Sequence, residues 1–387
     1  MAPEHTCGRT FYHKRAISGF LAKKYAEFLK LNKRITIEEF REKVHLELNV
    51  HITIAQVYKT FMKAKIIIHG SYKEQYQRLW DYCDELLKCN PGSTVYMETE
   101  LDEDIGRERF QRLYVCFGAL KRGYKSACRP VIGVDGCHLR GPHPGVLLTA
   151  VGIDPNDCLY PIAYAVVEAE NQMSWKWFVE FLKYNLEIYD QRKWTLISDR
   201  QKGLGTAIHE VLPEIEHRHC VRHLHNNFKK LHPGLALKER FWTCARLSYM
   251  TWFENQMESL KEYDGKARKW LIENTSPCHW SRSHFRTTPK CDILLNNLYE
   301  SFNSVIMAAR EKPILGMLGT LRIYLMERLR TKKEWMKKRN DKICPKIQKK
   351  LKKAKTEAAS NIARWSKEDQ FEVTHAYDGK YVVNLKK

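Results

Sequence analysis

Three apolar runs in quick succession constrain the fold of this chain more than any other feature. The runs are Val131 to Asp135, Val146 to Asp154 and Leu159 to Glu168. The stretches between them, residues 141–145 and 155–157, are rich in glycine, proline, asparagine and aspartate, which favour turns. Short apolar runs bounded by turn residues are typical of buried strands. The pattern therefore predicts three consecutive strands of one sheet.

Helices and strands alternate after these runs. We expect Ser174 to cap a helix that places Trp175, Phe178, Val179, Leu182 and Leu186 on one face. Next come a strand (194–198), a helix (203–211) and a short strand (215–219). The order β-β-β-α-β-α-β-α predicts an α/β fold with a ribonuclease-H-like mixed sheet, whose first and fourth strands lie side by side. Just before the sheet, 113–117 is expected to be a short helical approach that continues into 118–123.

The N-terminal part, residues 1–92, is expected to form a small helical domain. Thr36 and Glu39 are spaced as a capping box, and Thr53 is placed to start a second helix. Two short helices joined in this way have helix-turn-helix proportions. The same proportions occur in plain helical bundles, so both DNA contact and simple packing stay open. The cluster Asn90-Pro91-Gly92-Ser93 is the expected domain boundary.

Beyond that boundary we divide the chain into four parts. The first part of the core spans 112–220, a helical insertion 221–290, a core helix 291–330, and a basic tail 331–387. The insertion is expected to have an apolar face made of Phe241, Trp242, Leu247, Tyr249, Trp252 and Phe253. The core helix, expected over 294–310, carries Glu300 and has packing positions at Phe302 and Val305-Ile306.

Three acids stand where metal-dependent chemistry would need them. Asp135 and Asp199 each end an apolar run, and Glu300 lies on the predicted core helix. A carboxylate at the end of a buried strand is costly unless something compensates it, and a divalent cation is a common compensator. Taken singly, each has a plainer interpretation: a turn residue, a helix cap and a surface acid. Taken together they predict an all-carboxylate site for two Mg²⁺ or Mn²⁺ ions.

Charge and composition limit the classes of binding partner that we expect for this chain. The formal net charge is +21, which favours a polyanion such as nucleic acid, although a ribosome-associated protein or a binder of acidic proteins could share it. The lysine-rich stretch at 346–355 is a solvated helix face, a phosphate contact or a nuclear import signal. No run is apolar and long enough for a membrane span, and no signal peptide is visible. The 12 cysteines are scattered, which predicts reduced thiols inside the cell.

Three blocks of the sequence resemble a known family. The first runs from Val131 to Asp154, and the second joins 197–204 to His217-Arg218-His219-Cys220-Val221-Arg222-His223. The third is Asn296-Asn297-Leu298-Tyr299-Glu300-Ser301-Phe302-Asn303. They resemble the blocks of plant Mutator-like element (MULE) transposases, and the likeness runs from about residue 30 to the C-terminus. The resemblance implies a DDE site of Asp135, Asp199 and Glu300 on a ribonuclease-H-like core, with a helical insertion before the glutamate.

The resemblance also gives roles to residues outside the triad. Cys220 and His223 resemble the family's C/D-x-x-H signature, for which active-site organisation, DNA contact, core packing and metal binding stay open. Two ligands do not close a zinc site, and Cys278, His279 and His284 have an unconvincing spacing, so zinc is not expected. In related DDE transposases aromatic residues can stack on unpaired bases. Trp242 and Trp252 are candidates for that role, with buried packing as the alternative.

The ends of the chain depart from the family pattern. His5-Thr6-Cys7 resembles the close of an N-terminal zinc module without its partner cysteines, and 371–373 with 381–385 resembles the lead-in to a SWIM zinc finger without its ligands. We therefore expect a nuclear, DNA-binding, transposase-like protein, an enzyme only if the copy is active. The alternatives are a domesticated, non-catalytic DNA-binding or transcription regulator and a ribonuclease or repair nuclease. The expected DNA is the element's terminal inverted repeats, and homo-oligomerisation is left open.

Overall fold

The computed structural model describes residues 16–386, apart from 33, 104–105, 142–143, 342 and 377–378. For residues 69, 72 and 297–300 it describes the backbone and not the side chain. The predicted His5-Thr6-Cys7 motif therefore lies outside the described residues. No helix within the described part is long and apolar enough to cross a membrane.

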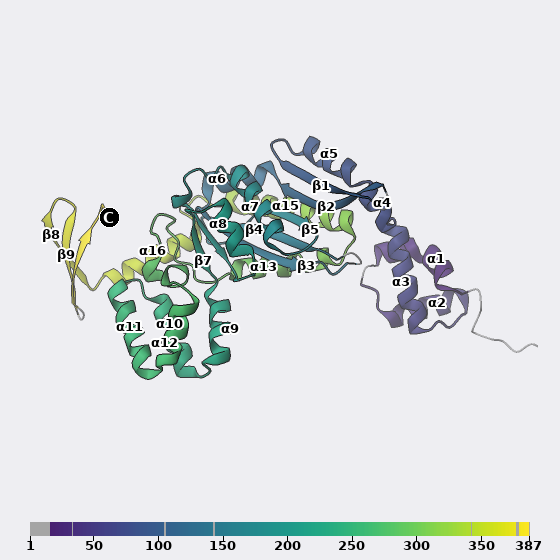
Figure 1. Ribbon diagram of the computed structural model, residues 1–387. Helices are drawn as coiled ribbons and strands as arrows, with labels where there is room; N and C mark the ends of the chain where they lie inside the picture. The colour runs from purple at the N-terminus through teal and green to yellow at the C-terminus, as the bar shows by residue number, and fades with distance from the viewer. Residues whose placement is uncertain are drawn as a thin grey trace, which may run out of the picture.

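A seven-stranded mixed sheet forms the centre of the molecule (Figure 1), as the predicted α/β class requires. Its spatial order is β1-β2-β5-β4-β3-β6-β7, with β3, β4 and β5 antiparallel and β6 and β7 added in parallel to β3. The prediction that the first and fourth strands of the 131–219 unit lie side by side is confirmed, because β3 pairs with β6. The strands are β1 (Thr94–Asp102), β2 (Arg107–Cys116), β3 (Val131–His138), β4 (Val146–Ile153), β5 (Leu159–Val167), β6 (Thr195–Ser198) and β7 (Glu216–His219).

Helices cover both faces of this sheet. Along β3 the side chains alternate, so that Ile132 and Val134 join one core and Val131 and Cys137 the other. The first core is closed by α7 (Gln172–Leu186) and α8 (Leu204–Val211), with Tyr124 of α6 (Gly118–Ala127). The second is closed by α5 (Leu79–Cys89), α13 (Asn297–Val305), α14 (Met307–Arg310) and α15 (Ile314–Lys337). Asp135 shares the alternation of Val131 and Cys137 and therefore faces the second core.

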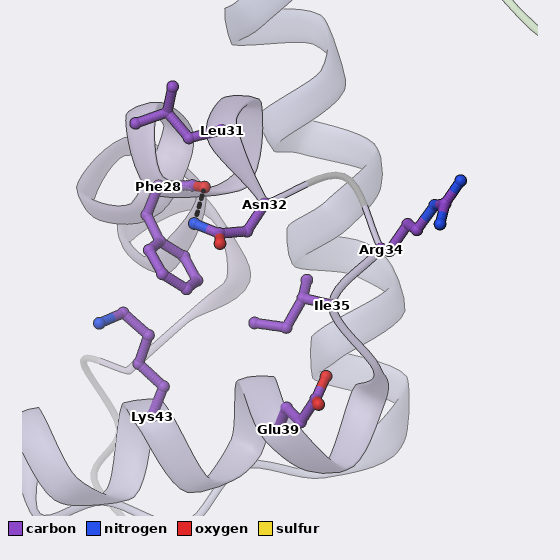
Figure 2. Close-up of a pocket in the computed structure, with 7 residues that line it drawn as sticks. All are labelled: Phe28, Leu31, Asn32, Arg34, Ile35, Glu39 and Lys43. Carbon is purple, nitrogen blue, oxygen red and sulfur yellow. Dashed lines mark hydrogen bonds between the residues drawn. The ribbon is translucent and has the colours of Figure 1, made fainter.

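Helices α1 (Ser18–Leu31), α2 (Ile37–Leu48) and α3 (Ile54–His69) have a small core of their own. Helix α4 (Tyr72–Gln77) packs against α15 instead. The predicted capping box of Thr36 and Glu39 is confirmed, and Thr53 caps α3 in the same way. A hollow of about 760 Å³ opens beside α1 and α2, where Asn32 Nδ2 donates to the carbonyl of Phe28 at 2.9 Å (Figure 2). None of the predicted site residues lines this hollow.

The segment after β7 is helical, as predicted, and forms a group of helices beside the sheet (Figure 1). Its helices are α9 (Val221–Leu231), α10 (Leu235–Arg246), α11 (Met250–Tyr263) and α12 (Gly265–Asn274). Two short 3₁₀ turns, η2 (Pro277–His279) and η3 (Arg282–His284), follow α12, and a third, η1 (Gln191–Lys193), precedes β6. Phe241 and Phe253 are buried in the insertion's core, but Tyr249 and Trp252 are exposed, so the predicted apolar face is only partly correct.

The basic tail continues from α15 into α16 (Pro345–Ala358), which has no buried residue. It ends in a separate three-stranded sheet of β8 (Asn361–Lys367), β9 (Gln370–His375) and β10 (Lys380–Asn384). Figure 1 shows this sheet at the opposite end of the molecule from the N-terminal helices. The two stretches predicted to lead into a SWIM finger, 371–373 and 381–385, lie mainly in β9 and β10.

Four sequence predictions about these elements are wrong. Residues 113–116 end strand β2 instead of starting a helix. Asn171 caps α7, and Ser174 is its capping-box partner at the third helical position. The helix expected over 294–310 is two helices divided at Ile306, and Val305 is exposed whereas Ile306 is buried.

Candidate active site

Asp135 and Asp199 stand at the same level of two neighbouring parallel strands. The ladder between β3 and β6 pairs Val131 with Thr195 and ends with Gly133 opposite Ile197. Each aspartate lies two residues beyond that last pair, so the ladder's register places one opposite the other. Parallel strands lie about 4.8 Å apart, and register partners point to the same face. The fold therefore brings together two of the three predicted acids.

The Asp135 carboxylate is largely enclosed and has a donor on each oxygen. Its Oδ1 accepts from the Gly136 amide at 3.0 Å, and its Oδ2 accepts from Asn303 Nδ2 at 2.7 Å. Burial and then the negative charge of Asp199 raise the pKa of Asp135 to about 7. Strand β3 continues to His138, so Asp135 is not the strand-end turn residue of the plainer interpretation. A buried acid facing a second acid is stabilised by a cation.

Asp199 follows β6 and shapes the loop that leads to α8. Its Oδ1 accepts from the amide of Gln201 at 3.1 Å, and its carbonyl accepts from Ser198 Oγ at 2.7 Å. Gly203, with φ 86°, occupies the N-cap of α8, and no side chain caps that helix. The alternative in which Asp199 caps the helix is therefore not what the fold uses.

Glu300 lies within α13, the helix that packs against β3 on the Asp135 side of the sheet. Its side chain lies outside the described residues, so the geometry of the complete triad stays a prediction. The same helix does reach the site through another residue, because Asn303 donates to Asp135. Asn303 belongs to the third sequence block but was not singled out there. Asn, with its donor amide, is a suitable partner for a carboxylate.

Sequence analysis also missed a further acid, Glu170. A Cβ atom on Gly136 would lie only 2.5 Å from Glu170 Oε1, so the carboxylate rests directly on the backbone next to Asp135. Gly136 is thus a position where a side chain would displace that carboxylate. Burial and the charge of Asp199 raise the pKa of Glu170 above its usual range. The residue lies between β5 and α7, where no apolar run marks it.

Cys220 and His223, the predicted C-x-x-H pair, lie together beside the acids. The His223 side chain hydrogen-bonds the Cys220 thiol, and the Asn296 amide donates to the same sulfur at 3.2 Å. Burial alone would raise the pKa of Cys220, but these hydrogen bonds outweigh it and hold the pKa below its usual value. His223 also lies close enough to Asp135 for its charge to lower the pKa of that acid. The pair is therefore part of the same site.

The two tryptophans proposed for base stacking have different environments. Trp242 is half-buried against Phe241 and His225, with the Arg246 guanidinium 5.2 Å from its ring centre. Trp252 is half-exposed and contacts Tyr249 edge to face. Trp242 thus fits the packing alternative, whereas Trp252 has a ring that a base could reach.

His217 and His279 form a cluster of imidazoles next to β6, the strand that precedes Asp199. His217 Nε2 and Ser198 Oγ are 2.8 Å apart, and His279 Nδ1 donates to the His217 carbonyl at 2.6 Å. Burial and then the proximity of His279 lower the pKa of His217 to about 4, so its ring is neutral. His284 hydrogen-bonds Ser283 instead of joining this cluster. These contacts are structural.

The donor set at the acids fits hard divalent cations. Asp135 keeps acceptor capacity on both oxygens, and the neighbouring carboxylates of Asp199 and Glu170 raise the local negative charge. No group of three His, Cys, Asp or Glu side chains within the described part is already arranged around a metal. The Glu300 side chain lies outside that part.

Comparison with known proteins agrees with the sequence resemblance. No curated protein matches the chain. A family model does match, over 131–227, a span that contains Asp135, Asp199 and the Cys220–His223 pair and ends before Glu300 and both tryptophans. Residues 131–227 match the MULE transposase domain, and this match supports placing the chain in the Mutator-like element transposase family.

Proposed function

We propose that this chain is a transposase-like enzyme that cuts and rejoins DNA strands at a DDE site formed by Asp135, Asp199 and Glu300. The observation that carries the proposal is the register of β3 and β6, which sets Asp135 opposite Asp199 on one face of the sheet. The Glu300 helix packs on that same face. The family match over 131–227 supports the transposase class.

The strand order supports a ribonuclease-H-like core. Within the unit from β3 to β7, the spatial order is third, second, first, fourth, fifth, with only the second strand antiparallel to its neighbours. This is the arrangement expected from the order of elements in the sequence. The preceding β1–β2 hairpin extends the sheet at the β5 edge.

The site's own residues supply oxygen ligands and hold them in place. Asp135 is set by Gly136 and Asn303, and Asp199 by the loop contact to Gln201. Two Mg²⁺ or Mn²⁺ ions held by Asp135, Asp199 and Glu300 would activate the attacking oxygen and neutralise charge on the phosphate. Burial of Asp135 keeps bulk water away and strengthens these charge interactions.

The reaction class follows from such a site. In the cleavage step, a water oxygen bonds to phosphorus as the bond to the 3′ oxygen breaks, and the proton lost by water balances the one gained by that oxygen. In the joining step, the freed 3′ hydroxyl attacks a second phosphodiester and releases another 3′ hydroxyl. Both steps are in-line displacements at phosphorus, and both use the same carboxylates.

DNA as the substrate, and the nucleus as its compartment, are part of the proposal. The formal net charge of +21 suits a polyanion. Helix α16 carries Lys346, Lys349, Lys350, Lys352, Lys353 and Lys355 and buries no residue, so its lysines are available to phosphates. Of these, Lys350 also pairs with Asp157 and Lys353 with Glu357.

Metal-dependent cleavage of a branched or nicked duplex tests this function. We expect the wild type to cut with Mg²⁺ or Mn²⁺ and Asp199→Asn to lose on the order of a thousandfold in rate, because one cation ligand is removed. Asp190→Asn, which alters an exposed acid paired with Lys193, is the matched control and should cut normally. DNA binding without metal should be equal in all three proteins. Equal nicking by wild type and Asp199→Asn would overturn the proposal.

A further inference from the structure

Cys220 lies where three separate segments of the candidate site meet. Its amide donates to the carbonyl of Ser198, the residue before Asp199, at 2.8 Å. Its sulfur accepts from the amide of Asn296, which is the N-cap of α13, at 3.2 Å. Cys220 is fully buried. One residue therefore touches both the strand that ends at Asp199 and the start of the helix that carries Glu300.

We propose that Cys220 is a positioning residue that fixes the start of the Glu300 helix against the Asp199 strand. The inference rests on the proposed function, because the separation of these two acids matters only if they share a site. The whole helical insertion lies between them in the sequence. Local chain geometry therefore does not set their separation, and a contact across the base of the insertion must do so.

Few other described contacts hold this helix start. The amide of Val221 donates to the carbonyl of Leu294 at 2.9 Å, next to the Cys220 contact. The Asn296 side chain is fully buried, and neither its Oδ1 nor its Nδ2 has a partner among the described residues. No side chain caps α13. Among the described residues, the Cys220 sulfur is thus the side-chain atom that accepts a hydrogen bond from the backbone at the start of α13.

His223 is a second residue that contacts the Cys220 sulfur. It lies near the start of α9 and hydrogen-bonds the same sulfur. The sulfur therefore accepts from the side chain and the backbone of His223 on α9 and from the Asn296 amide at the start of α13. Alanine at 220 would leave these donors buried without that acceptor, which is costly. Aspartate would keep acceptors toward both helices, because a carboxylate has two oxygens.

Three variants test the proposal with two measurements. Backbone amide hydrogen exchange over 294–303 in the metal-free protein reports on the helix start, and Mn²⁺-dependent DNA cleavage reports on the acids. In Cys220→Ala we expect faster exchange in that segment and cleavage reduced about 100-fold, because small displacements of catalytic groups are costly. Cys220→Asp should restore slow exchange and most of the cleavage. If the alanine variant does not fold, Cys220→Val, which is close in size to cysteine and has no acceptor, replaces it with the same expected results.

Cys244→Ala is the matched control, because Cys244 is an equally buried thiol in α10. It should leave exchange over 294–303 and cleavage unchanged. Native exchange and native cleavage in Cys220→Ala, or no rescue by Cys220→Asp, would overturn the positioning role. If the wild type itself does not cleave DNA, the proposed function fails instead, and the exchange measurement still decides whether Cys220 holds the helix start.

Discussion

Two groups of acidic side chains lie on neighbouring strands of the sheet, and among the described residues only one of them contains an ion pair between buried side chains. On β7, Glu216 and Arg218 form an ion pair at 2.7 Å, with side chains 6% and 1% exposed. On β3 and just after β6, the carboxylates of Asp135 and Asp199 face each other. Since a buried charge is costly unless it is paired, the first group belongs to the folded scaffold, whereas the second is one that a bound cation would stabilise.

The β7 pair is satisfied from several directions. Glu216 accepts from Thr195 Oγ1 at 2.6 Å and from the Arg286 amide at 2.7 Å. Arg218 donates to the carbonyl of Cys291 at 2.7 Å, and its guanidinium lies 3.8 Å from the Phe285 ring centre. These contacts tie β7 to the segment that leads back toward α13. The difference teaches that burial alone does not separate an acid of the scaffold from a candidate cation ligand; the partners of each carboxylate must be compared.

The largest expected effect concerns the Glu216–Arg218 ion pair on β7. Glu216→Ala leaves Arg218 buried without its partner, so the free energy of unfolding should fall by about 3–5 kcal/mol. Urea unfolding at neutral pH measures it. The control is Glu214→Ala, because Glu214 pairs with Arg192 on the surface and such pairs contribute about 0–1 kcal/mol. Equal losses in the two variants would show that the β7 pair is no more important than a surface pair.

A smaller change in the free energy of unfolding is expected when metal is added, because a metal would bind the Asp135–Asp199 group. If cations bind the folded acids and not the unfolded chain, Mn²⁺ at one hundred times its dissociation constant adds about 2.7 kcal/mol to stability. Thermal unfolding of the wild type should therefore shift upward with Mn²⁺. Asp135→Asn should lose most of this shift, whereas Asp190→Asn should keep it. An identical shift in Asp135→Asn would place the bound metal elsewhere.

The smallest effect, counted per pH unit, is a pH dependence in the absence of metal. The pKa of Asp135 is raised to about 7 in the fold from an unfolded value near 3.8. Between these values the folded state binds more protons than the unfolded state, so this group makes the protein more stable as pH falls from 7 toward 4. Its contribution is at most about 1.4 kcal/mol per pH unit. Asp135→Asn should flatten that slope in denaturant unfolding measured from pH 4 to 8; an unchanged slope would contradict the assignment.

Strands β3, β4 and β5 were predictable because continuous apolar runs in the sequence indicate buried strands. Strands β3, β4 and β5 are buried along nearly their whole length, and Asp135 stands out as an interruption of that pattern. Strand β2 escaped prediction because only its second half is buried, and the β1–β2 hairpin alternates charged residues at the sheet's edge. A short run such as 113–117 next to a helix gives no period that separates the two structures.

Sequence analysis found the acids that end apolar runs and missed the residues that approach them from elsewhere in the chain. Asp135 and Asp199 each end an apolar run, whereas Glu170 comes to Gly136 through the path of the chain between β5 and α7. Asn303 reaches Asp135 across the layer between helix and sheet. Trp252 looked like a core residue because aromatic residues usually pack, yet it is half-exposed. Such neighbours depend on tertiary packing that one sequence does not display.

The backbone hydrogen bond between Val221 and Leu294 has a consequence for the length that the helical insertion can take. Because it closes the insertion at its base, the helices between these residues form a loop whose entrance and exit are adjacent. Lengthening such a closed excursion changes its entropy only slowly with residue number. A longer or shorter insertion is therefore expected to change the free energy of folding only slightly, because the chain leaves and re-enters the core at the same place.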